Sequence, residues 1–132
     1  MRYLHPHRGR ARVTAFSGLR VLVVEDEATV AMLIEDMLEE LGCEIAASVA
    51  SVSRAMDIAP VVDVDLAMLD VNVAGEMVFP VALLLQERQI PVLFSTGYGM
   101  AGLPSEFSAC QVLAKPFSQS DLVAKLALSL EH

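Results

Sequence analysis

Several residue types are scarce in this chain, and each shortage argues against a class of function. There is no tryptophan, and the three histidines, His5, His7 and His132, all lie near the ends of the chain. Their positions argue against zinc catalysis and histidine general-base chemistry. The two cysteines, Cys43 and Cys110, are too few for a disulfide scaffold and lack metal-ligand spacing. We therefore expect two small buried thiols in a reducing cytosol.

Long apolar runs are also missing, although 55% of the 132 residues are hydrophobic. Charged residues interrupt every candidate run well before the ~20 residues that a bilayer-spanning helix needs. The length suits one domain with one compact core. We therefore expect a soluble, cytoplasmic, single-domain protein that does not bind membranes.

Charge is unevenly distributed along the chain. Residues 1–18 contain arginines and no acid, whereas residues 19–132 carry all 17 acidic residues and bring the net charge to −8. The start of the chain lacks the apolar segment of a secretory signal, so we expect a loose basic extension over 1–18. The domain proper should span 19–130, and 131–132 resemble the remnant of a purification tag. An acidic domain repels nucleic acid phosphates, so no nucleic acid partner is expected.

Five short apolar runs alternate with helix-like segments. Near-continuous apolar character is typical of parallel strands that are covered on both faces. The alternation predicts an α/β fold, a doubly wound five-stranded parallel sheet with the flavodoxin-like order 2-1-3-4-5 and helices on both faces. The expected strands are Arg20–Val24, Ile45–Val49, Leu66–Leu69, Val92–Phe94 and Val112–Ala114.

Two helices are clearly marked. Apolar residues recur at helical spacing over 30–41, with Gly42 as the stop. The last helix begins at Ser118, and Asp121 three residues later completes a capping box. Further helices are expected over about 51–59 and 77–88. The fourth helix, over 99–108, should be short or irregular because it contains glycine and proline.

Reactive residues follow the predicted strands. Glu25 and Asp26 follow the first strand, Asp70 ends the third, Thr96 follows the fourth and Lys115 follows the fifth. The carboxyl ends of parallel strands meet at one edge of the sheet, where ligands of such folds bind. Four separate stretches of sequence should therefore build one site.

The chemistry of this site follows from its charges. Two carboxylates ~4 Å apart repel by about 4 kcal/mol at an effective dielectric near 20, so a cation must offset them. Hard oxygen ligands suit Mg²⁺, and Lys115 adds a second positive charge. A carboxylate beside a metal, an ammonium and a hydroxyl is equipped to attack a phosphoryl group, and Asp70 is the natural nucleophile.

Four segments in order, VLVVEDE, LDVN, FSTGYG and AKPF, resemble the motifs of response-regulator receiver domains over about residues 19–130. The resemblance implies that Asp26 and Asp70 ligate Mg²⁺ directly and that Glu25 acts through water. It also implies a further ligand in the backbone carbonyl of Asn72. The catalytic set would be Asp70, Thr96 and Lys115. Thr96 would hydrogen-bond the phosphoryl group, and Lys115 would pair with it. A cis Lys115–Pro116 bond would aim the lysine into the site.

The same resemblance implies a function in two-component signalling. Asp70 would accept a phosphoryl group from a histidine kinase or phosphotransfer protein, and the chain would signal through an unknown output protein or act as a phosphate sink. It would not be an enzyme beyond slow self-dephosphorylation, and homodimer formation stays open. The FSTGY segment is similar to the Phe-Ala-Thr-Gly motif of single-domain receivers of alphaproteobacteria.

One departure from the family pattern concerns the switch residue. Val112 stands where the family usually has Tyr or Phe, so we expect Tyr98 to report the phosphorylated state instead.

Three alternative functions remain beside the receiver. An aspartate-nucleophile phosphatase of the same topology would use the pair Asp63 and Asp65, although this pair precedes a strand. The second alternative is a flavin-binding electron carrier, but this chain has neither the phosphate-binding loop nor the tryptophan that such a carrier uses. The third is a degenerate receiver that only binds partners, and the intact acidic pocket argues against it.

Overall fold

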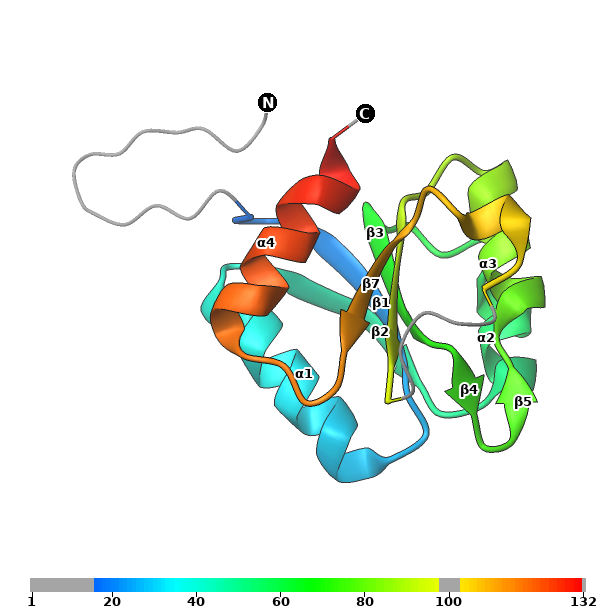
Figure 1. Cartoon of the computed structure of the whole chain (residues 1–132), viewed down its shortest axis with the longest axis horizontal. Coiled ribbons are helices and arrows are strands. Elements are labelled where there is room, and N and C mark those ends of the chain that lie inside the picture. Colours follow the sequence, from blue (N-terminus) through cyan, green and yellow to red (C-terminus); the bar gives the residue numbers. More distant parts are fainter. Residues whose placement is uncertain (1–15, 98–102, 132) are drawn as a thin grey trace.

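A computed structural model describes residues 16–97 and 103–131 of the chain. Strands and helices alternate along it, as Figure 1 shows by colour from blue to red. The first half contains β1 (Arg20–Val24), α1 (Ala28–Glu40), β2 (Glu44–Val49), α2 (Val52–Ile58), β3 (Leu66–Asp70) and β4 (Asn72–Val73). The second half contains β5 (Glu76–Met77), α3 (Phe79–Glu87), β6 (Val92–Thr96), the 3-10 helix η1 (Ser105–Phe107), β7 (Gln111–Ala114) and α4 (Gln119–Leu130).

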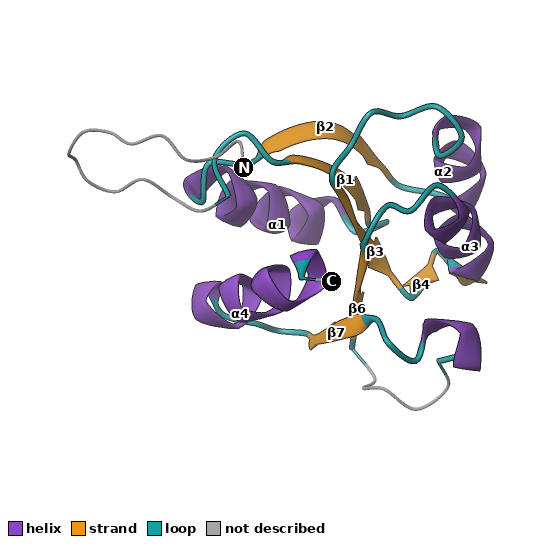
Figure 2. Ribbon diagram, turned by 90° about the horizontal axis from the view of Figure 1, so that it is seen from above, coloured by secondary structure: helices purple, strands orange, loops and turns teal. Residues whose placement is uncertain are grey.

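The main sheet has the predicted topology. Within the described residues, five parallel strands are ordered β2-β1-β3-β6-β7, which is the order 2-1-3-4-5 of a doubly wound fold. Figure 2 shows α1 and α4 on one face of this sheet and α2 and α3 on the other. The described helices are all too short or too polar to cross a bilayer.

Two hydrophobic clusters cover the two faces of the sheet, and this explains the apolar runs in the sequence. The central strand β3 is buried at every position, because its alternate residues face opposite clusters. Leu66 and Met68 pack on the side of α1 and α4, whereas Ala67 and Leu69 pack on the side of α2 and α3. A parallel strand buried on both faces needs apolar residues throughout.

The helix boundaries follow the predicted signals with one exception. The capping box at Ser118 and Asp121 is confirmed, since the Ser118 hydroxyl accepts from the Asp121 N–H and the Asp121 carboxylate accepts from the Ser118 N–H. The fourth helix is indeed short and irregular, because it consists of η1 alone within the described residues. Helix α3 begins at Phe79, two residues later than predicted, because the preceding residues form a hairpin.

This hairpin pairs β4 with β5 between the end of β3 and the start of α3 (Figure 1). Its turn consists of Ala74 and Gly75, whose φ angles are +52° and +88°. Two positive φ angles in a two-residue loop are the pattern of a type I′ turn, whose twist matches that of the flanking strands. The sequence pattern does not predict this hairpin.

A cluster of three phenylalanine rings attaches η1 to the sheet. Phe94 on β6, Phe79 on α3 and Phe107 on η1 lie with ring centroids 5.5 to 6.0 Å apart. Phe94 and Phe107 are buried, and Phe94 pairs with Val112 across the two strands. Edge-on and offset ring contacts of this kind stabilise beyond the area that they bury.

Candidate functional site: an acidic cleft at the carboxyl edge of the sheet

The sheet brings the predicted site residues together at its carboxyl edge. Glu25 follows β1, Asp70 ends β3, Thr96 ends β6 and Lys115 follows β7. They surround or line a cleft of about 390 Å³. The lining residues are Asp26, Glu27, Asp70, Asn72, Thr96, Gly97 and Lys115. Glu27 and Gly97 were not singled out from the sequence, although each directly follows a residue that was.

The register of the strand pairing determines where each of these residues lies along the direction of the strands. Asp70 pairs with Ser95, and Thr96 pairs with Ala114. The Lys115 backbone N–H extends the ladder by donating to the Thr96 carbonyl at 2.9 Å. The Lys115–Pro116 bond is cis, as predicted. Tyr98 lies outside the described residues, so its predicted role stays a prediction.

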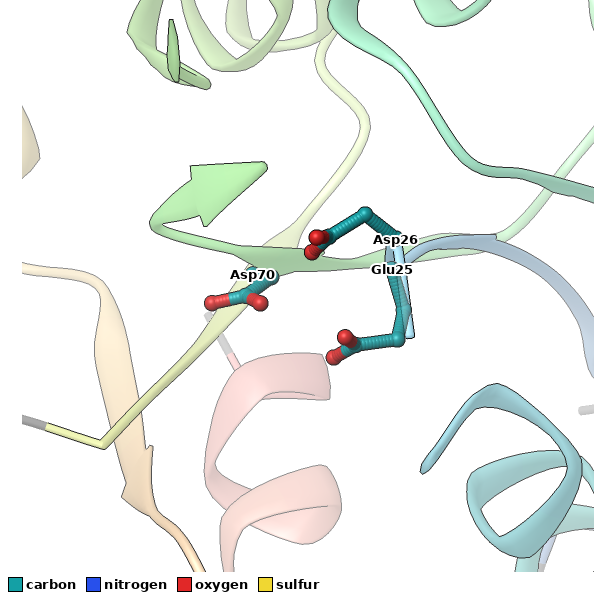
Figure 3. A group of neighbouring side chains, drawn as sticks. All are labelled: Glu25, Asp26 and Asp70. Atoms are coloured by element: carbon teal, nitrogen blue, oxygen red, sulfur yellow. The ribbon is translucent and has the colours of Figure 1, made fainter. Parts of the chain in front are cut away.

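Three carboxylates gather in the cleft. Figure 3 shows the side chains of Glu25, Asp26 and Asp70 pointing to the same side, and one oxygen of each lies within 4.8 Å of the others. Glu25 is 3% exposed and Asp70 is 8% exposed, so water screens them poorly. Buried like charges this close need cations between them.

Lys115 provides one of these cations. Its Nζ donates to Glu25 Oε1 at 2.9 Å and to Asp70 Oδ2 at 3.1 Å. Burial lowers the pKa of Lys115, but the contacts with both carboxylates outweigh this effect and raise the pKa above its usual value. Lys115 is therefore a cation at neutral pH.

The carboxyl of Asp70 has a strongly shifted pKa. Burial raises the pKa of Asp70 to about 6, against the hydrogen bond and the charge of Lys115, which lower it. The nearby Glu25 charge raises this pKa, and the backbone N–H of Asn72 lowers it by donating to the carboxylate. Asp70 is thus mostly ionised at pH 7 but becomes protonated as the pH falls through about 6.

The donor set of the cleft fits a divalent metal. Carboxylate oxygens from Asp26 and Asp70 face a common space, and hard oxygen ligands with room for water suit Mg²⁺. Both oxygens of Glu25 already accept hydrogen bonds, from Lys115 Nζ and from the Glu27 N–H at 3.0 Å. This arrangement fits a role through water better than direct ligation.

The pair that suggested a phosphatase lies at the opposite edge of the sheet. Asp63 and Asp65 precede β3. Arg20, at the start of β1, donates from Nε to the Asp63 carbonyl and from its backbone N–H to Asp65 Oδ2, both at 2.9 Å. These aspartates tie the first residues of neighbouring strands together and lie at the amino ends, away from Asp70. The structure therefore gives the phosphatase alternative no support.

Comparison with known proteins agrees with the observed fold. The family model of the response regulator receiver domain matches residues 21–127. The transcriptional regulatory protein PdtaR of Mycobacterium tuberculosis is 30% identical over 86% of this chain and 57% of its own length. The chain thus spans about half the length of the curated relatives that it matches.

Solved structures agree with this match. SdrG of Sphingomonas melonis Fr1 is 37% identical with a TM-score of 0.77, and the match covers 86% of this chain and 98% of SdrG. A BeF3-activated conformation of SdrG, from Pseudomonas melonis Fr1, is 38% identical with a TM-score of 0.74, over 87% of this chain and 99% of that one.

A third structure shares the fold. The receiver domain of the histidine kinase PA1611 of Pseudomonas aeruginosa is 22% identical with a TM-score of 0.72, over 86% of this chain and 98% of that one. That protein has a magnesium ion coordinated in its active site cleft. Receiver domains bind Mg²⁺ at an acidic site, and this chain has such a cluster. With the matched family model, the shared sheet order and the acidic cleft, the chain belongs to the response-regulator receiver domain family.

Proposed function

We propose that Asp70 accepts a phosphoryl group from a histidine kinase or phosphotransfer protein in a Mg²⁺-dependent reaction. The observation that carries this proposal is the placement of Asp70 between a lysine ammonium at 3.1 Å and two further carboxylates within 4.8 Å. A buried nucleophile with these neighbours is suited to an incoming phosphate, because positive charge offsets the repulsion between two anions.

In the transfer step, an oxygen of Asp70 attacks the phosphorus atom of the phosphohistidine. A new O–P bond forms as the P–N bond breaks, and the histidine nitrogen leaves with the electron pair and takes up a proton. Asp70 acts as the nucleophile in its ionised form. Lys115 can follow the charge from the carboxylate to the phosphoryl oxygens because its Nζ already contacts Asp70.

Asp26, Asp70 and the backbone carbonyl of Asn72 would hold Mg²⁺ directly, and Glu25 would act through water. Bound there, the metal supplies positive charge to the phosphoryl oxygens in the transition state. Thr96 lines the same cleft and would hydrogen-bond the phosphoryl group. The chain then signals through phosphorylation-dependent contacts with an output protein or serves as a phosphate sink. The BeF3-activated conformation of SdrG supports a phosphoryl-driven response in a relative of this chain.

The test is labelling with a small phosphodonor such as acetyl phosphate, followed by mass spectrometry of the intact protein. We expect one acid-stable, base-labile phosphoryl group that maps to Asp70 and requires Mg²⁺. Asp70→Asn should abolish it. Asp57→Asn is the matched control, since Asp57 is an exposed aspartate on α2 that should not affect labelling. Undiminished labelling of Asp70→Asn, or labelling in excess chelator, would contradict the proposal.

A further inference from the structure

The hairpin β4–β5 lies directly beside the cleft. It begins at Asn72, two residues after Asp70, and it is fixed at both ends. The Val71 N–H donates to the Ser95 carbonyl at 3.0 Å, and the Val78 N–H donates to the Val71 carbonyl at 2.9 Å. The first bond joins the hairpin to β6 and the second closes it. The position of Asn72 therefore depends on the geometry of the hairpin.

The pairing register leaves the peptide groups of Asn72 directed away from the partner strand. Antiparallel pairs alternate between residues that exchange hydrogen bonds and residues that do not. The Val78-to-Val71 bond flanks the Asn72–Met77 pair, which makes it a pair of the second kind. The Asn72 N–H instead donates to the Asp70 carboxylate. Its carbonyl belongs to a residue that lines the cleft.

The side chain of Asn72 is bound to the turn rather than to the cleft. Its Oδ1 accepts a hydrogen bond from the Gly75 N–H at 2.9 Å. This bond forms within the left-handed turn, in which Gly75 has a φ of +88°. Glycine adopts such an angle without steric cost, whereas a β-branched residue does not. The Asn72 side chain is thus tied to a turn whose backbone suits glycine.

We propose that the Ala74–Gly75 turn is a positioning device for the cleft, in which Gly75 holds Asn72 so that its N–H orients Asp70 and its carbonyl would be available to Mg²⁺. Gly75 touches neither phosphate nor metal and acts through Asn72 alone. This inference rests on the proposed function, because it assigns the hairpin a role in Mg²⁺ binding and phosphoryl acceptance at the same cleft.

The test compares Gly75→Val with Gly18→Val. Both glycines have positive φ, +88° and +80°, and in both an added Cβ would meet nothing within 4 Å, so valine brings the same kind of backbone strain. Gly18 precedes β1 at the amino edge of the sheet and serves as the structural control. Gly75→Asn tests rescue, because asparagine tolerates a left-handed backbone. Mg²⁺ affinity is measured by NMR titration, and Asp70 labelling by acetyl phosphate is followed separately.

We expect Gly75→Val to weaken Mg²⁺ binding by about tenfold or more, as loss of a group that orients a metal ligand commonly does. Gly18→Val should lower the melting temperature about as much as Gly75→Val does, yet bind Mg²⁺ with wild-type affinity. Gly75→Asn should regain most of the Mg²⁺ affinity that Gly75→Val loses. Wild-type affinity in Gly75→Val, or an equal loss in Gly18→Val, would overturn the hairpin proposal.

Failure of the proposed function has a different outcome. If the wild type binds Mg²⁺ and Gly75→Val does not, but acetyl phosphate leaves Asp70 unlabelled, the positioning role stands and phosphoryl acceptance fails. If Asp70 is labelled but Mg²⁺ affinity is the same in all variants, the function stands and the positioning role fails. A wild type that binds no Mg²⁺ overturns both.

Discussion

The carboxyl of Asp70 is held in a place where its ionised form is disfavoured. Burial raises its pKa to about 6, although Lys115 and the Asn72 N–H favour the charged form. In the unfolded chain this carboxyl has the ordinary value of 3.8. The folded protein must therefore ionise Asp70 at a free-energy cost that the unfolded chain does not have, and the cost appears as the pH rises from about 4 through about 6.

Asp70→Asn should consequently stabilise the metal-free protein at neutral pH. A pKa raised from 3.8 to about 6 corresponds to about 3 kcal/mol in the free energy of unfolding at pH 7, as an order of magnitude. The gain should shrink as the pH falls from about 6 to about 4, because only below the unfolded pKa of 3.8 is Asp70 protonated in both states. Mg²⁺ should reduce the gain at pH 7 by stabilising the wild-type carboxylate. Urea unfolding at several pH values, with chelator and with Mg²⁺, measures these differences.

The control for this prediction is again Asp57→Asn, which removes an exposed carboxylate and should change the free energy of unfolding by no more than a few tenths of a kcal/mol. If Asp70→Asn destabilised the protein at pH 7 and not at pH 4, the ion pair with Lys115 would stabilise the ionised form of Asp70 by more than burial disfavours it. The direction of the Asp70 pKa shift would then be wrong.

At the scale of elements, η1 depends on few contacts. Phe107 inserts against Phe94 and Phe79, and Gln86 on α3 donates from Nε2 to the Glu106 carbonyl at 3.3 Å and to Cys110 Sγ at 3.8 Å. Phe94 lies two residues before Thr96 on the same strand. The ring cluster therefore joins the segment η1 to the strand that carries the phosphoryl-binding hydroxyl of the proposed site.

Phe107→Ala should release η1 before it unfolds the sheet. We expect a loss of about 3 kcal/mol in the free energy of unfolding, typical of a buried phenylalanine replaced by alanine. The neighbouring Cys110 thiol, which is partly buried, should then react faster with a maleimide, measured by peptide mass spectrometry. Cys43 is buried between the helices α1 and α4 and the sheet and serves as an internal standard.

The milder variant Phe107→Leu keeps an apolar side chain in the cluster and should label Cys110 at a rate between those of the wild type and Phe107→Ala. Equal acceleration at Cys110 and Cys43 would indicate global unfolding. An unchanged rate at Cys110 would show that Phe107 does not hold the segment.

Elements with a repeated pattern or a local stop signal could be predicted from the sequence. The buried strand β3 was recognised by its continuous apolar run and α4 by its capping box. The hairpin could not be predicted because its strands have two residues each, too few for any periodicity, and because Ala74 adopts a positive φ that alanine rarely takes. The start of α3 was misplaced for the same reason, since the hairpin uses residues that could have continued the helix.

At the scale of the whole molecule, the candidate site was predictable because the carboxyl ends of parallel strands all lie at the same edge of the sheet. Glu25, Asp70 and Lys115 belong to different segments, yet each follows or ends a parallel strand and so had to reach the same edge. The two hydrogen bonds of Lys115 and the occupied oxygens of Glu25 were not predictable. They depend on side-chain rotamers that are set by packing, which sequence spacing does not determine.

The scattered origin of the cleft has a consequence for the order of events during folding. Lys115 and Glu25 are 90 residues apart in the chain and meet only through three intervening strand pairings. Contacts of such long range form late, because the chain between them must be ordered first. The metal site should therefore be incomplete in the folding transition state, so Mg²⁺ should bind the native state and hardly bind the state that limits the refolding rate.

Mg²⁺ at about 100 times its dissociation constant stabilises a folded protein by about 2.7 kcal/mol. For this chain we expect that gain to appear mostly as slower unfolding, with refolding nearly unchanged. Stopped-flow circular dichroism in urea, with Mg²⁺ or with chelator, separates the refolding rate from the unfolding rate. If Mg²⁺ accelerated refolding by the whole factor that this stabilisation corresponds to, the cleft would be among the first structures to form. In a cell, such a protein would resist unfolding for longer whenever its metal site is filled, so the ion that serves the chemistry would also lengthen the lifetime of the folded chain.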